Sequence, residues 1–249
     1  MSLAFSAFLS EGLIGKRFLE APEETLSVAL MVIGAAIVII CAYLLGSINF
    51  AIIISGKRYK DDIREHGSKN AGMTNMMRTY GKKAAALTLS GDAIKAFASC
   101  FIGYLLIGQL GAYLAGVFCT IGHVFPIFYR FKGGKGVVTA FASILMCDPF
   151  VCLILLVLFI LIVLISKFIS LGSIMCMLLY PLILDRITRI MTLWGTGTEL
   201  SSPYIIFAVI IAVIIIVKHW ENIKRLMNGT ENKFSFKKSV KEKTVDEGK

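Results

Sequence analysis

A glycine-rich basic loop, Phe131–Thr139, lies between two long apolar segments and reads FKGGKGVVT. Glycines let backbone N–H groups approach an anion closely, and Lys132 and Lys135 add the positive charge that amides lack. The spacing is not that of a Walker phosphate-binding loop, and no predicted strand precedes it. The loop therefore favours phosphate chemistry at a membrane surface, whereas the alternative is a solvated turn at the end of a spanning helix.

Two further polar clusters flank apolar segments. The first covers residues 61–78, where Arg64 and Arg78 can grip phosphate through forked N–H donors. Its uncharged hydrogen-bonding candidates for substrate oxygens are Ser68, Asn70, Thr74 and Asn75. The second cluster, Lys218–Arg225, directly follows the last apolar segment. A plain loop explains one such cluster, but two clusters and a glycine loop indicate one polar site.

Polar residues also occur inside the apolar segments. Asp92 and Lys95 are spaced i,i+3 and can pair on one helical face, either to lock helix packing or to contact a substrate. Ser47 follows Gly46, a pair that small-residue packing between membrane helices also explains. His123 is a candidate proton carrier or a polar anchor at a helix end.

The composition determines the class of protein that must position these groups. Of the 249 residues, 57% are hydrophobic and only 17% are charged, which excludes an ordinary water-soluble domain. Apolar runs bounded by charges, glycine or the Asp148-Pro149 turn signal predict an all-α, polytopic integral membrane protein with about seven transmembrane helices. The expected segments are Leu26–Ile54, Ala84–Ile107, Tyr113–Phe128, Val137–Cys147, Phe150–Ile165, Ile169–Leu184 and Pro203–Val217. Val137–Cys147 is too short to cross a bilayer alone, so it is expected to be tilted, re-entrant or half-length.

Charge asymmetry predicts the orientation. If the N-terminus is outside and the C-terminus cytoplasmic, most of the 26 Lys and Arg residues fall on the inside. The same charges would attract anionic membrane lipids, which explains the net charge of +10 without any active site. We expect an N-terminal extension over 1–26, in part a surface helix without a cleaved signal peptide, a membrane domain over 27–232, and a disordered tail over 233–249.

The six cysteines are scattered and form no C-x-x-C pair, so neither a disulfide framework nor a metal site is expected. They are interpreted as small packing residues. No internal repeat is found, which weakens the case for an inverted-repeat transporter.

The ordered motifs carry a resemblance. Four stretches, in this order, resemble the bacterial acyl-phosphate-dependent glycerol-3-phosphate acyltransferases, the PlsY family. They are Gly46-Ser47 and Asp62–Asn75, which together form the first motif, then Gly122–Thr139, and then His219 through Asn232. The resemblance runs from about Ala42 to Asn232. It implies a seven-helix enzyme of the bacterial plasma membrane, with its active site facing the cytoplasm. Such an enzyme transfers a fatty acyl group from acyl phosphate to the sn-1 hydroxyl of glycerol 3-phosphate, giving lysophosphatidic acid and phosphate in the first step of phospholipid synthesis.

The resemblance also implies roles for residues. It assigns catalysis to four residues and substrate or phosphate binding to the polar loops. The catalytic set is Ser47, Arg64, His219 and Asn222. The binding set that it implies is Ser68, Asn70, Thr74, Asn75, Gly133, Gly134, Lys135, Gly136, Ser170 and Ser173, and the chemistry of the residues themselves adds His123 and Lys132 to this set. Asp92, Lys95 and Glu231 are expected to be structural, no cofactor, metal or nucleic acid is expected, and the expected partners are the two substrates and membrane lipids.

The sequence departs from the family pattern at several positions. Asn49 stands where the family has proline, Met73 where it favours alanine, and Trp220 where it favours arginine. Lys69 stands where the family favours glycine and adds bulk and charge to the first motif. These departures leave a catalytically degraded member as one alternative. A transporter or binding protein for a phosphorylated solute and a membrane scaffold also remain alternatives. For an active enzyme, the expected mechanism has a substrate phosphate oxygen, rather than His123 or His219, take the proton of the attacking hydroxyl.

Overall fold

The computed structural model describes residues 12–13, 24–194 and 201–234, and this part of the chain is helical, without strands. The helices are α2 (Glu24–Ser47), α3 (Phe50–Tyr59), α4 (Met73–Tyr80), α5 (Lys82–Val124), α6 (Val137–Cys147), α7 (Pro149–Ser166), α8 (Ile169–Leu193), α9 (Ser201–Lys218) and α10 (Trp220–Met227), with short 3-10 turns η1 (Ile63–Glu65) and η2 (Ile127–Tyr129). Most of the extension 1–26 and of the tail 233–249 lies outside the described residues.

Helix α5 is two antiparallel passes joined at a tight turn. Ile107 and Gly108 leave helical geometry, and Gly108 has a φ of 64°, which glycine adopts without steric cost. On either side of the turn, a Cβ added at Gly103 would lie 2.2 Å from the carbonyl oxygen of Gly111. These contacts require the two halves to run back along each other, as the expected break between Ile107 and Tyr113 predicted.

Four described helical segments are long and apolar enough to cross a membrane, or five if the bent pair α9 and α10 counts as one span. Helix α6 has the bounds expected for it and, at 11 residues, is a shorter apolar helix. The fold is therefore a polytopic helical bundle. The number of spans, about seven, stays a prediction, as do the orientation of the termini and the domain bounds.

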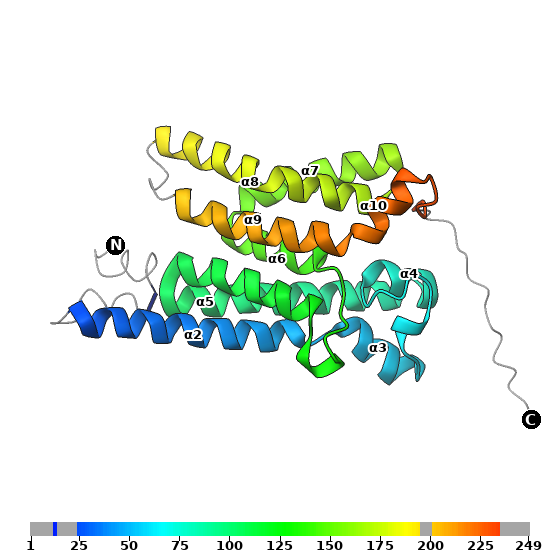
Figure 1. Cartoon of the computed structure of the whole chain (residues 1–249), viewed down its shortest axis with the longest axis horizontal. Coiled ribbons are helices and arrows are strands. Elements are labelled where there is room, and N and C mark those ends of the chain that lie inside the picture. Colours follow the sequence, from blue (N-terminus) through cyan, green and yellow to red (C-terminus); the bar gives the residue numbers. More distant parts are fainter. Residues whose placement is uncertain (1–11, 14–23, 195–200, 235–249) are drawn as a thin grey trace, which may run out of the picture.

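Figure 1 shows two layers of long helices with α6 between them. Helix α2 packs along α5 in one layer, and α8 packs against α7 and α9 in the other. The first layer depends on small residues: a Cβ at Gly46 would lie 2.2 Å from the carbonyl oxygen of Cys119, and one at Gly122 would lie 2.3 Å from that of Tyr43. Such close backbone approach is how membrane helices gain packing contacts without a hydrophobic driving force.

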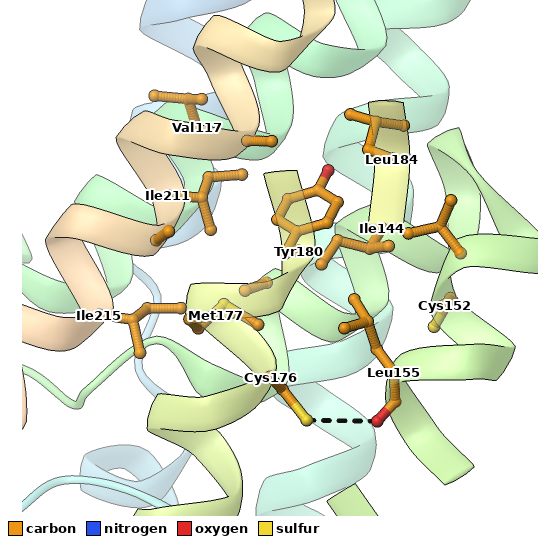
Figure 2. Close-up of a cluster of buried hydrophobic side chains, with 14 residues drawn as sticks. Val117, Ile144, Cys152, Leu155, Cys176, Met177, Tyr180, Leu184, Ile211 and Ile215 are labelled. Carbon is orange, nitrogen blue, oxygen red and sulfur yellow. Dashed lines mark hydrogen bonds between the residues drawn. The ribbon is translucent and has the colours of Figure 1, made fainter. Parts of the chain in front are cut away.

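The second layer encloses the largest buried apolar cluster (Figure 2). Tyr180 and Met177 of α8 lie at its centre, between Ile144 of α6, Leu155 of α7 and Ile211 of α9. The Cys176 thiol donates to the Leu155 carbonyl oxygen at 3.3 Å, which joins α8 to α7. This cluster holds α6, and with it the glycine loop that precedes α6, against the rest of the bundle.

Several elements differ from the expected segments. Helix α5 ends at Val124, four residues before the expected end at Phe128. The first apolar segment breaks at Ile48–Asn49, because the Asn49 side chain accepts a hydrogen bond from the Ile52 N–H and starts α3 as an N-cap. The polar stretch after α3 contains helix α4 rather than loop alone. Helix α8 continues nine residues past the expected end at Leu184 to Leu193, and an Asp185–Arg189 i,i+4 pair supports this last part.

Candidate active site

A cavity of about 400 Å³ is lined in part by residues of α4 and α10. These two helices lie at one end of the bundle (Figure 1). Polar side chains from the α4 region, the α8 start and the α10 region line one part of it. An apolar wall from α6 and α7 lines the other, and its members are Val138, Phe141, Leu145, Cys152, Leu156 and Phe159. One cavity thus joins hydrogen-bonding groups to an apolar surface deep in the bundle.

The glycine loop is positioned by close backbone contact with the end of α5. The Gly134 N–H donates to the His123 carbonyl oxygen at 3.1 Å, and a Cβ at Gly133 would lie 2.0 Å from that same oxygen. Gly136, with a φ of 81°, begins α6 as its N-cap. Larger residues would push the loop away from α5, so the glycines are required by shape.

Lys135 carries the charge of this loop into the cavity. Its ammonium donates a hydrogen bond to the side-chain oxygen of Asn222. Burial, together with the nearby Arg225 and Arg78 guanidinium groups, lowers the pKa of Lys135 to about 8. Several cations crowded around one cavity, with Glu231 as a nearby anion, form a place where a bound anion would relieve repulsion.

The first polar cluster is shaped by the buried amide of Asn75. Its Oδ1 accepts from the Ser68 N–H at 3.0 Å, and its Nδ2 donates to the carbonyl oxygens of His66 and Asn70 at 2.9 and 3.1 Å. The Asn75 amide thus holds the backbone of residues 66–70 close to the start of α4. Ser68, Asn70 and Thr74 are thereby brought to the cavity lining, as is Asn75 itself.

Ser47 and Arg64 lie outside the cavity lining. The Ser47 hydroxyl, fully buried, donates to the Tyr43 carbonyl oxygen at 2.8 Å and accepts from the Ile127 N–H at 3.4 Å. Arg64 pairs with Asp62 at 2.6 Å and donates to the Tyr129 carbonyl oxygen at 3.1 Å. Both side chains therefore tie the first motif to the segment that leads into the glycine loop.

Glu231 is the centre of a hydrogen-bonded group formed with Ser170, Asn222 and Arg225. One carboxylate oxygen accepts from Ser170 at 2.9 Å and from Asn222 at 2.7 Å, and the other accepts from Arg225 at 2.7 Å. Burial opposes ionisation, but the Arg225, Asn222 and Ser170 hydrogen bonds outweigh it and lower the pKa of Glu231. The carboxylate thus fixes α8, α10 and the segment after α10 around the cavity.

His219 lies in the bend between α9 and α10. Its Nδ1 lies 2.8 Å from the Ile215 carbonyl oxygen and must donate to it, because a carbonyl oxygen can only accept. Burial and the neighbouring Lys135 charge lower the pKa of His219 to about 4, so the imidazole is neutral near pH 7. Its Nε2 is then left with an unshared electron pair in a cavity-lining residue.

The other predicted residues divide between the lining and its support. His123, Asp92, Gly136, Ser170 and Ser173 line the cavity. Lys95 is buried behind the lining, 2.9 Å from Asp92. Lys132, Gly133 and Gly134 lie outside the lining, where the Lys132 carbonyl oxygen accepts from Arg64 at 3.4 Å.

Sequence reasoning did not assign Arg225 or the apolar wall to the site. The signal for Arg225 was its place one turn after Asn222 in an amphipathic cluster. The apolar wall had no signal, because every residue of α6 and α7 reads as a lipid-facing or packing residue. The two residues that most depart from the family pattern, Lys69 and Trp220, do not line the cavity.

Comparison with known proteins gives one consistent family. The sequence model described as glycerol-3-phosphate acyltransferase matches residues 36–229. A glycerol-3-phosphate acyltransferase of Finegoldia magna is 40% identical over 199 residues, covering 78% of this chain and 93% of its own. One of Carboxydothermus hydrogenoformans is 40% identical over 209 residues, covering 84% and 100%.

Solved structures agree with the sequences. The glycerol 3-phosphate form of PlsY (YgiH), an integral membrane glycerol 3-phosphate acyltransferase, superimposes with a TM-score of 0.70 at 33% identity, over 81% of this chain and 96% of that one. The lysophosphatidic acid form of the same protein gives 0.68 at 32% identity, over 81% and 95%. The chain therefore belongs to the glycerol-3-phosphate acyltransferase family of integral membrane proteins.

Proposed function

We propose that this protein transfers a fatty acyl group from acyl phosphate to the sn-1 hydroxyl of glycerol 3-phosphate, producing lysophosphatidic acid and inorganic phosphate. The observation that carries the proposal is the single cavity that joins a cationic, hydrogen-bonding part to an apolar wall. A phosphorylated polar substrate and a fatty acyl chain need these two environments side by side.

The polar part suits two phosphate-bearing molecules. Lys135, Arg78 and Arg225 supply positive charge, and neutral donors and acceptors come from Asn70 and Ser173. The glycerol 3-phosphate form of the related structure supports the first substrate, and its lysophosphatidic acid form supports the product. On the apolar side, Phe141 and Leu156 face the cavity from α6 and α7 and would contact the acyl chain.

In the proposed reaction, the sn-1 hydroxyl oxygen attacks the acyl carbonyl carbon. The bond between that carbon and the bridging oxygen breaks, and phosphate leaves with the bonding electrons. Acyl phosphate is a mixed anhydride with an activated carbonyl and a good leaving group, so positioning and charge stabilisation supply most of the catalysis. A substrate phosphate oxygen accepts the hydroxyl proton, which leaves every side chain in its starting state.

Within this scheme, Lys135, Arg78 and Arg225 hold the phosphates. Asn222, which accepts from Lys135 and donates to Glu231, keeps the lysine directed into the cavity. His219 offers Nε2 as an acceptor that orients the attacking hydroxyl. Ser47 and Arg64 support the glycine loop from behind, and their loss would act through the position of that loop.

The polar end of the bundle is proposed to face the cytoplasm of a bacterial plasma membrane. Helices α3 and α4 lie at this end (Figure 1). The last turn of α3 carries Lys57 and Arg58, and the last turn of α4 carries Arg78. Positive charge on short loops is retained on the cytoplasmic side. The cavity's polar groups gather at one end, which an enzyme with a cytoplasmic soluble substrate requires and a transporter with two-sided access does not.

The position of the acyl group on the product tests this proposal. Purified protein in lipid nanodiscs would receive glycerol 3-phosphate and carbonyl-labelled acyl phosphate, and carbon–proton correlation NMR would locate the new ester. An ester at the sn-1 carbon is expected. An ester at the sn-2 carbon, or hydrolysis of acyl phosphate without ester formation, would contradict it. Lys135→Met is expected to lose activity, whereas Lys57→Met, an exposed lysine on α3, is the matched control.

A further inference from the structure

Lys95 sits at the centre of a buried polar cluster behind the cavity, with 5% of its surface exposed. Its ammonium has three protons and meets three acceptors in hydrogen-bond geometry. These are the carbonyl oxygen of Gly46 at 3.0 Å, the carbonyl oxygen of Ile48 at 2.5 Å, and His123 Nδ1 at 3.0 Å. Asp92 Oδ1 lies 2.9 Å from the ammonium and balances its charge, yet accepts no directed hydrogen bond.

This geometry determines which nitrogen of His123 carries a proton. Both carbonyl oxygens can only accept, and so can the Asp92 carboxylate. Asp92 Oδ1 is 2.9 Å from the ammonium but meets no donor in hydrogen-bond geometry, whereas Nδ1 at 3.0 Å does, so the third ammonium proton is directed at Nδ1. A ring nitrogen that accepts a hydrogen bond cannot hold a proton of its own. The competing arrangement places a proton on Nδ1 facing Asp92 Oδ1 at 3.5 Å, but it then turns an N–H toward an ammonium only 3.0 Å away.

The other ring nitrogen of His123 faces the glycine loop. A Cβ added at Gly134 would lie 2.2 Å from His123 Nε2, so the loop passes directly over that edge of the ring. His123 is also part of the cavity lining. A proton on Nε2 would therefore be presented where the glycine loop meets the cavity.

His219 has the opposite arrangement in the same cavity. Its Nδ1 donates to the Ile215 carbonyl oxygen, which leaves Nε2 without a proton. The two histidines thus differ in role although both are buried. His123 can donate a hydrogen bond to an anionic oxygen, and His219 can accept one from a hydroxyl group.

We propose that Lys95 is a positioning residue that holds His123 as a neutral imidazole with its proton on Nε2, so that His123 donates a hydrogen bond to a substrate oxygen in the cavity. The same ammonium binds the two carbonyl oxygens that flank Ser47, so one side chain aligns the start of the first motif with the glycine loop. The substrate contact rests on the proposed function. The proton position does not.

Nitrogen NMR of the imidazoles tests the proton position directly. The chain has three histidines, so histidine-selective 15N labelling of the protein in nanodiscs gives three ring systems, and His123→Gln identifies the signals of His123. We expect an unprotonated Nδ1 and a protonated Nε2. A proton on Nδ1, alone or together with one on Nε2, would overturn the proposal.

A double variant tests the role of Lys95. Lys95→Met alone would leave Asp92 as an unpaired buried charge and risks misfolding, so Asp92→Leu is combined with it. In the folded double variant, we expect His123 to lose its single tautomer and the KM for glycerol 3-phosphate to rise by about tenfold or more, as for loss of a hydrogen bond to a charged group. Retention of the wild-type tautomer would show that Lys95 does not set it.

The two readouts separate this inference from the proposed function. A folded wild-type protein that has the Nε2–H tautomer but no acyltransferase activity would contradict the proposed reaction and leave the role of Lys95 standing. An active enzyme with a proton on His123 Nδ1 would contradict the role of Lys95 and leave the proposed reaction standing. Lys57→Met, on an exposed surface of α3, is expected to change neither the tautomer nor the KM.

Discussion

Lys135 donates a hydrogen bond to the side-chain oxygen of Asn222, a residue 87 positions further along the chain. This contact joins the glycine loop to the bend between α9 and α10. Asn222 in turn donates to Glu231 at 2.7 Å. A cation, an amide and a carboxylate therefore form one chain of hydrogen bonds. This chain directs the Lys135 side chain into the cavity and keeps it from turning toward solvent.

The lowered pKa of Lys135 predicts a pH dependence. Because its pKa is about 8, the free enzyme loses this charge as the pH rises through 8, and kcat/KM for glycerol 3-phosphate should fall on the alkaline side. Lys135→Arg keeps the charge over this range. In steady-state kinetics, the decline of kcat/KM on the alkaline side should move to higher pH in the arginine variant. An unchanged limb would mean that another group titrates.

His219 is predicted to act through hydrogen bonding. Because Nδ1 donates to Ile215 and the imidazole is neutral, His219→Gln can keep an acceptor near the attacking hydroxyl, whereas His219→Ala cannot. We expect activity to fall by about 100-fold in the alanine variant and to be mostly retained in the glutamine variant. Equal collapse of both in folded protein would argue for proton transfer by His219 instead.

Lys69 is predicted to be a strained position. Its φ of 58° is left-handed, a conformation that costs a non-glycine residue roughly 1–2 kcal/mol. Lys69→Gly should therefore raise the thermal unfolding temperature in detergent. Lys69→Ala removes the charge without relieving the backbone, so it serves as the control. Equal stabilisation by both substitutions would attribute the effect to charge rather than to backbone strain.

Glu231 is predicted to support the site rather than to react. Glu231→Gln removes the charge that pairs with Arg225 at 2.7 Å and places an amide beside Ser170 and Asn222. We expect a loss of about 1–3 kcal/mol in stability, visible as a lower unfolding temperature, together with reduced activity. A variant as stable as the wild type but inactive would point to a direct contact between Glu231 and substrate.

Much of the fold follows from hydropathy, because lipid requires long apolar helices with every backbone group bonded internally. The bounds of α6 and the turn within α5 were predicted by charge and by glycine. The break before α3 was not, since it depends on a side-chain cap by Asn49 within an unbroken apolar run. The end of α8 was placed too early because Asp185 and Arg186 ended the apolar run, although α8 continues through both residues.

The polar half of the site was also predictable, because hydrogen-bonding residues between membrane spans stand out against apolar surroundings. The sequence could not distinguish the residues that line the cavity from those that support the lining. Asn70 and Ser47 are both small polar residues, yet only Asn70 reaches the cavity, since the Ser47 hydroxyl is bonded to the Tyr43 carbonyl oxygen. The apolar wall can be identified only from the three-dimensional packing, because Phe141 differs from other apolar residues only in that its side chain lines a cavity.

The choice of acyl donor tests the central claim most directly. Purified protein in nanodiscs would be given glycerol 3-phosphate with either acyl phosphate or acyl-CoA of the same chain length, while lysophosphatidic acid and released phosphate are measured together. We predict equal amounts of both products from acyl phosphate and no turnover with acyl-CoA. Turnover with acyl-CoA, or none with acyl phosphate from a folded protein that binds glycerol 3-phosphate, would contradict the proposed reaction.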